Sequence, residues 1–215
     1  MFELLQRLLN GKSSRLPIQN SGETTVGLLV AAGRSSRFDP SGTNNKLLAE
    51  LDGLPVVCHS AIHLAEAVSS KIAVVRPDAY VLDQKLTALG FTVVRCPDAH
   101  SGMGHSISWG VAEALKRFEC ERIVVALGDM PFVQSSTIAK LIGYSKITRA
   151  VVAPRYQGKR GNPVVFNSDH FEALSRLSGD KGAAQYMTKI DVSLVDVDDP
   201  GILKDIDTPE DLAQQ

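Results

Sequence analysis

Short runs of apolar, β-branched residues alternate along the chain with segments whose apolar residues recur every three or four positions. The runs predict strands at 26–32, 72–75, 92–94, 123–127, 150–153, 164–166 and 192–197. The recurring apolar residues predict helices at 56–69, 81–89, 106–118 and 135–142. Most strand segments are apolar on both faces, as in a parallel sheet that helices cover on each side. The order therefore predicts an α/β fold with a mostly parallel sheet between helices, and ligands at the carboxyl ends of its strands.

The charges of the chain almost cancel, because 23 Lys and Arg stand against 24 Asp and Glu, for a net charge of -1. Proteins dedicated to nucleic acids usually carry a basic excess, so no nucleic-acid partner is expected. A content of 44% hydrophobic residues can supply a folded core and argues against intrinsic disorder.

Neither a membrane segment nor a disulfide framework is predicted. The longest apolar runs, such as 26–32, are far shorter than the ~20 residues needed to span a bilayer, so no membrane partner is expected. Cys58, Cys96 and Cys120 are odd in number and form no CxxC or zinc-ligand pattern. Reduced, inert and buried thiols are expected, which fits a cytoplasmic protein.

The first 25 residues differ in composition from the rest of the chain. Residues 1–9 place apolar side chains at helical spacing, and residues 10–25 are rich in Gly, Ser and polar side chains. We expect residues 1–25 to form an N-terminal amphipathic helix and a linker. A single globular domain at 26–215 is expected to follow.

Residues 29–37, Leu-Val-Ala-Ala-Gly-Arg-Ser-Ser-Arg, end the first predicted strand in a turn of small residues. Such a backbone can approach a polyphosphate closely, and its free amides can bind phosphate oxygens. Arg34, Arg37 and Lys46 add positive charge for the β- and γ-phosphates of a nucleotide. The segment matches neither the dinucleotide-binding nor the P-loop pattern. Taken alone, it is also compatible with a glycine turn flanked by exposed basic residues.

Aspartates supply candidate ligands for a metal ion. Asp129 follows an apolar strand at the predicted mouth of the sheet, where a carboxylate can hold a hard divalent cation. A turn or helix-capping aspartate is the alternative interpretation. Near the C-terminus, Thr208 is a predicted helix N-cap with a proline at the first helical position. This capping role leaves Asp205 and Asp207 unexplained.

Six motifs follow one another in a family-specific order. They are residues 29–37 with Asn45-Lys46-Leu47-Leu48 downstream, Gly-Met-Gly-His-Ser at 102–106, Gly-Asp-Met-Pro at 128–131, Gly-Lys-Arg-Gly-Asn-Pro at 158–163, Gly-Asp-Lys-Gly-Ala at 179–183 and Asp-Ile-Asp-Thr-Pro-Glu-Asp at 205–211. In this order they resemble the molybdenum-cofactor nucleotidyltransferase family, and within it the cytidylyltransferase branch. The resemblance covers about residues 26–213.

The resemblance implies a three-layer, Rossmann-like nucleotidyltransferase fold and a Mg²⁺-dependent reaction. In that reaction a nucleotidyl group, CMP from CTP, passes to the phosphate of molybdopterin or the molybdenum cofactor, and pyrophosphate is released. Ala32 favours CTP over GTP, because Ala-Ala-Gly in the first loop accompanies cytosine in the family. The implied partners are CTP (or GTP), molybdopterin, and a molybdoenzyme or its chaperone that receives the product.

The resemblance also implies roles for individual residues. Arg37, Lys46 and Asp129 are the implied catalytic residues, and Asp129 and Asp207 the implied Mg²⁺ ligands. The acceptor would contact Arg160, Gly161 and Asn162. The implied nucleotide-binding residues are Ala31, Ala32, Gly33, Arg34, Ser35, Arg37, Lys46, Gly102, Gly104, Ser106 and Asp129.

The sequence departs from the family pattern on the acceptor side. Asn162 stands where histidine is usual, Ala184 stands where arginine is usual, and residues 38–44 lengthen the run before Lys46. Two alternatives therefore stay open. One is a nucleotidyltransferase for another phosphate acceptor, such as a sugar phosphate or methylerythritol phosphate. The other is a non-catalytic carrier of the same fold that binds nucleotide or pterin.

Overall fold

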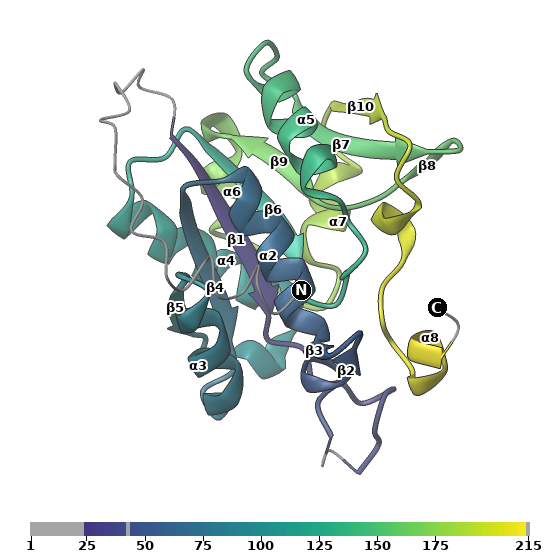
Figure 1. The fold of residues 1–215 in the computed structure, drawn as a ribbon. Coiled ribbons are helices and arrows are strands. Elements are labelled where there is room, and N and C mark those ends of the chain that lie inside the picture. The colour runs from purple at the N-terminus through teal and green to yellow at the C-terminus, as the bar shows by residue number, and fades with distance from the viewer. Residues whose placement is uncertain (1–23, 42–43, 214–215) are drawn as a thin grey trace, which may run out of the picture.

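The computed structural model describes residues 24–41 and 44–213 and contains an eight-stranded sheet of order β10-β7-β9-β6-β1-β4-β5, with β8 paired to β7 (Figure 1). Its strands are β1 (Thr25–Ala31), β4 (Ser70–Val75), β5 (Thr92–Arg95), β6 (Arg122–Leu127), β7 (Val151–Tyr156), β8 (Lys159–Arg160), β9 (Val164–Asn167) and β10 (Val192–Asp196). The β1–β4, β1–β6, β4–β5 and β7–β10 pairs are parallel, whereas β9 runs antiparallel to β6 and β7, and β8 to β7. The predicted, mostly parallel sheet is confirmed.

Helices cover both faces of this sheet. They are α2 (Val56–Ala67), α3 (Tyr80–Ala88), α4 (Met103–Arg117), α5 (Ser135–Ser145), α6 (Phe171–Leu174) and α7 (Gly182–Met187). A further helix, α8 (Pro209–Ala213), packs through Leu212 in a small cluster with Leu51, Val56 and Ile206. Short 3-10 turns are η1 (Lys46–Leu48), η2 (Ala99–Ser101), η3 (Ser168–His170) and η4 (Pro200–Leu203), and β2 (Glu50–Leu51) and β3 (Leu54–Pro55) form a separate hairpin. Each predicted helix and strand overlaps an observed one.

Alternate residues of the central strands enter two separate cores, as the period of two requires. Leu29 and Ala31 pack beneath α2, α3 and α5, whereas Leu28 and Val30 pack beneath α4, α6 and α7. Figure 1 shows the resulting three layers. The apolar character of both faces of β1, β6 and β9 is explained, because nearly all residues of these strands are buried.

The N-terminal prediction falls almost entirely outside the described residues, so the amphipathic helix and linker stay a prediction. The predicted boundary at residue 25 is off by one residue, because Thr25 already belongs to β1 rather than to the predicted linker. The carbonyl oxygen of Thr24 accepts hydrogen bonds from the backbone N–H groups of Glu121 and Arg122. In the ranges 24–41 and 44–213, no helix has the length and apolar character that a bilayer crossing requires.

The segment after β10 returns along the carboxyl ends of the strands, as the yellow part of Figure 1 shows. Its anchor is Asp199, which is 1% exposed and accepts hydrogen bonds from Gln134 N at 2.9 Å and Thr137 Oγ1 at 2.7 Å. The backbone of Gly201 then lies directly against the Phe132 carbonyl, where a Cβ atom would overlap it. These contacts bring residues 205–207 toward Asp129.

The close approach at Gly201 gives a stability prediction. We expect Gly201→Ala to lower the free energy of unfolding by at least about 1–3 kcal/mol, because the added methyl group meets rigid backbone. Gly143→Ala is the matched control: its Cβ would meet nothing within 4 Å, and alanine favours the helix by about 1 kcal/mol. In urea unfolding, the free energy of unfolding should therefore fall for Gly201→Ala and rise for Gly143→Ala. Unchanged stability in Gly201→Ala would contradict the packing described.

Candidate active site

A cleft of about 410 Å³ opens at the carboxyl ends of β1 and β6. This is where ligands bind in open α/β sheets, because loops from adjacent strands diverge there. The cleft is lined by Val30, Ala32, Gly33, Arg34, Lys46, Leu47, Ala99, His100, Gly102, Met103, Ser106, Leu127, Asp129 and Asp180. Polar and charged groups from distant segments therefore share one concave site.

The loop after β1 is fastened to η1 by one serine. The Ser35 hydroxyl donates to Asn45 Oδ1 at 3.1 Å and accepts from Lys46 N at 3.2 Å. Ser35 is 8% exposed and has a φ of 56°, so the loop turns sharply there. Its contacts fix the position of Lys46 relative to Gly33 and Arg34 across the intervening residues.

Lys46 lies at the centre of a charge network. Its side chain is only 9% exposed, and its Nζ lies 2.7 Å from both Asp129 Oδ2 and Asp207 Oδ1. Arg37 makes a further ion pair with Asp207 at 2.6 Å. Burial by itself would lower the pKa of Lys46, but attraction and hydrogen bonds from Asp129 and Asp207 outweigh it and raise the pKa. Lys46 therefore stays a cation at neutral pH.

Three carboxylates meet beside Lys46. One oxygen each from Asp129, Asp205 and Asp207 lies within 4.8 Å of the other two. Partial burial, together with the like charges of Asp207 and Asp129, raises the pKa of Asp205. Three oxygen donors at this spacing suit a hard divalent cation, which would relieve their repulsion. The donor set thus fits the predicted kind of metal.

Backbone contacts hold the C-terminal aspartates in place. The N–H group of Ile206, which is 1% exposed, donates to the Asp129 carbonyl oxygen at 2.8 Å. The Asp211 carboxylate accepts from the N–H groups of Asp207 and Thr208 at 2.9 and 2.7 Å, which lowers the pKa of Asp211. α8 begins at Pro209, as the sequence predicts, and Asp211 caps its first turn.

The structure brings most predicted nucleotide-binding residues to the cleft. Ala32, Gly33, Arg34, Lys46, Gly102, Ser106 and Asp129 line it. Ala31, Ser35, Arg37 and Gly104 lie outside the lining. Ala31 faces the core beneath α2, Ser35 and Arg37 make the contacts above, and Gly104 packs against the backbone of Ser178. Their predicted roles in binding stay predictions.

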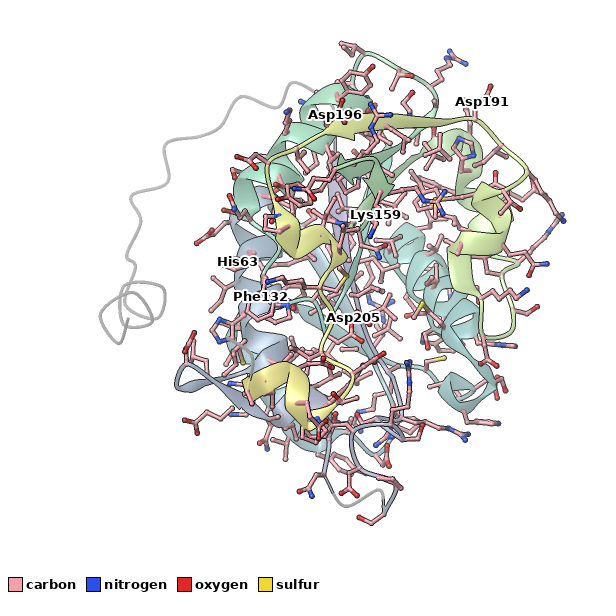
Figure 2. The ribbon with its side chains drawn as sticks, turned by 90° about the vertical axis from the view of Figure 1, so that its right-hand side faces the viewer. His63, Phe132, Lys159, Asp191, Asp196 and Asp205 are labelled. Carbon is pink, nitrogen blue, oxygen red and sulfur yellow. The ribbon has the colours of Figure 1, made fainter. Side chains whose placement is uncertain are left out.

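The predicted acceptor residues lie at the end of the β7–β8 hairpin and directly after it. Arg160 ends β8 and is exposed, and the Asn162 N–H group donates to the Ile202 carbonyl oxygen at 3.1 Å. Asn162 shares a small cavity with His63 and Met130, the residue that follows Asp129. Figure 2 shows Lys159 of this hairpin and Asp205 on the same face of the molecule.

Sequence reasoning missed two acidic members of the site. Asp205 lies in one cluster with Asp129 and Asp207. Side chains two residues apart point to the same side of an extended segment, so the spacing of Asp205 and Asp207 could have indicated that both carboxylates contribute. Asp180 lines the cleft from a loop, and only its place in the motif at 179–183 could have drawn attention to it.

Comparison with known proteins finds a matching family and several relatives. A family model described as "MobA-like NTP transferase domain" matches residues 27–194. The purine catabolism protein PucB of Bacillus subtilis (strain 168) is 28% identical over 200 residues, 86% of this chain and 93% of PucB. The 3-deoxy-manno-octulosonate cytidylyltransferase of Chlorobium chlorochromatii is 30% identical over 104 residues, 48% of this chain and 40% of its own.

Among solved structures, Rv0371c from Mycobacterium tuberculosis H37Rv is similar over 91% of this chain and 98% of its own. The identity is 26% and the TM-score 0.78. A second structure of Rv0371c is a complex with manganese, with a TM-score of 0.74, 26% identity and coverage of 89% and 97%.

Proposed function

The chain belongs to the MobA-like NTP transferase family, and we propose that this nucleotidyltransferase transfers CMP from CTP to the phosphate of molybdopterin or the molybdenum cofactor, releasing pyrophosphate. The observation that carries the proposal is that a small-residue loop, the buried cation Lys46 and Asp129 line one cleft, and that Asp129 belongs to a cluster of three carboxylates beside Lys46. We place the reaction in the cytoplasm, with a molybdoenzyme or its chaperone as the recipient of the product.

The proposed reaction demands neutralised charge more than a general base. A phosphate oxygen of the acceptor attacks the α-phosphorus of CTP, and the bond to the β-phosphate oxygen breaks. Attacking and leaving groups are already anions, so alignment and compensation of their charge dominate the barrier. In this proposal Arg34 and Lys46 bind the leaving pyrophosphate, while amides of the Ala32–Gly33 turn hold phosphate oxygens.

Mg²⁺ is the proposed cofactor, held by Asp129 and Asp207 with Asp205 as a further carboxylate. The three oxygen donors within 4.8 Å of one another suit its preference for hard ligands. When bound, such an ion compensates phosphate charge and orients the triphosphate. The manganese complex of Rv0371c supports a divalent cation in a relative of similar fold.

CTP is the proposed donor on two grounds. Ala32 occupies the loop position that accompanies cytosine in the resembling family, and it is 4% exposed in the cleft wall. The curated relative from Chlorobium chlorochromatii is named a cytidylyltransferase. The same relative favours a second candidate, in which CMP passes to another anionic acceptor, because Asn162 and Ala184 depart from the expected acceptor residues.

Pyrophosphate release with each acceptor and nucleotide tests the proposal. With Mg²⁺ and reduced molybdopterin, we expect CTP to support release at least about tenfold faster than GTP, as a pocket matched to one base requires. Methylerythritol phosphate and a 2-keto sugar acid serve as competing acceptors. Turnover with one of these alone would establish the second candidate. Tight nucleotide binding without turnover on any acceptor would instead establish a non-catalytic carrier.

A further inference from the structure

The carboxylate of Asp180 lines the cleft without an evident structural role. Among residues 24–41 and 44–213, no hydrogen bond or ion pair joins this side chain to the protein. It lies between two helices but caps neither, since α4 and α7 both lack a side-chain cap. The Asp180 carboxylate is a charged hydrogen-bond acceptor in a cleft, and it is available to a ligand because the fold does not use it.

The position of Asp180 is nevertheless fixed. The Gly104 N–H group donates to the Gly179 carbonyl oxygen at 2.8 Å, and the Gly179 N–H group donates to His105 Nδ1 at 3.3 Å. Gly102, at φ 113°, lies so close that a Cβ atom there would be 2.5 Å from Asp180 Oδ1. The loop is thereby pinned to the first turn of α4, and the carboxylate is preorganised at the cleft wall.

The cleft crosses from one face of the sheet to the other. Leu47, next to Lys46, belongs to the core beneath α2, whereas Ala99 belongs to the core beneath α4. If the phosphates occupy the end with Lys46 and Asp129, as the proposed function requires, the nucleoside extends toward α4. There Ala99, Gly102 and Met103 supply an apolar and backbone wall, and Asp180 supplies a charged edge.

We propose that the Asp180 carboxylate accepts a hydrogen bond from the exocyclic amino group of the nucleobase and so selects cytosine over uracil. A carboxylate can only accept hydrogen bonds. Cytosine offers an N–H donor at C4, whereas uracil places a carbonyl oxygen there and would set two acceptors against each other. This inference rests on the proposed binding of a nucleoside triphosphate and adds the residue that reads its base.

Binding of CTP and UTP, each with Mg²⁺ and without acceptor, tests the inference by calorimetry. We expect the wild type to bind CTP at least about tenfold more tightly than UTP, the ratio that one charge-assisted hydrogen bond supplies. In Asp180→Asn that ratio should fall to about one, because an amide can either accept or donate. Asp198→Asn, at another exposed aspartate, is the matched control and should keep the wild-type ratio.

The outcomes separate this inference from the function on which it rests. The inference is overturned if Asp180→Asn keeps the wild-type ratio of CTP affinity to UTP affinity, or if the wild type binds CTP and UTP equally well. In either case CTP-dependent pyrophosphate release, and with it the proposed function, still stands. Failure of the wild type to bind any nucleoside triphosphate overturns the proposed function and this inference together. Unfolding of the Asp180→Asn variant in urea should match the wild type, because no residue of the ranges 24–41 and 44–213 forms a hydrogen bond or ion pair with the Asp180 side chain.

Discussion

The Asp129→Asn variant is expected to release pyrophosphate at least about 10²–10³-fold more slowly than the wild type at saturating CTP and Mg²⁺, because it loses a carboxylate that would hold the divalent cation at the reacting phosphates. Asp129 offers one of three oxygens within 4.8 Å and also holds Lys46 at 2.7 Å. Asparagine keeps the shape of the side chain but neutralises it. Steady-state turnover and Mn²⁺ binding measure the two consequences separately.

The fold should survive this change. The backbone contact that anchors the C-terminal segment uses the Asp129 carbonyl oxygen, which the substitution leaves in place. Lys46 also keeps Asp207 as a partner. Circular dichroism and urea unfolding serve as controls, with Asp198→Asn as a matched loss of one exposed charge. Turnover within a few-fold of the wild type would falsify the assignment of Asp129 to the reacting centre.

The layers of the fold could be predicted because strands that are buried on both faces consist of continuous apolar runs, which are visible in the sequence. The antiparallel direction of β9 could not be predicted, since the apolar run at 164–166 carries no sign of the direction in which the strand runs. α6 and α7 were missed for a different reason. With four and six residues, they are too short to display a helical repeat.

The site was predictable in its residue types but not in its contacts. Lys46 is separated from Asp129 by 83 positions and from Asp207 by 161, so only the fold brings them to 2.7 Å. That Arg37 pairs with Asp207 also follows from the path of the C-terminal segment. Asp180 shows the limit most clearly, because its place in the cleft depends on backbone contacts with Gly102 and Gly104.

Replacing Lys46 with methionine is expected to slow pyrophosphate release by at least about 10²-fold, because the leaving group loses a preorganised cation. The same substitution should increase, rather than decrease, the affinity of the site for a divalent cation. The Lys46 ammonium bonds Asp129 and Asp207 at 2.7 Å each, so it competes with a divalent cation for the same oxygens. Without nucleotide, Lys46→Met should therefore bind Mn²⁺ more tightly than the wild type, as titration followed by electron paramagnetic resonance would measure.

The pH dependence of this competition follows from the raised pKa of Lys46. The ammonium stabilises the folded state fully below its ordinary pKa of 10.5, and this contribution is lost only as pH rises through the raised value. At neutral pH the competing cation is thus always present in the wild type. Lys189→Met, a matched loss of an exposed ammonium, should leave both turnover and Mn²⁺ affinity unchanged. If Lys46→Met instead weakened Mn²⁺ binding, Lys46 would be organising Asp129 and Asp207 rather than competing with the cation for them, and the competition proposed above would be wrong.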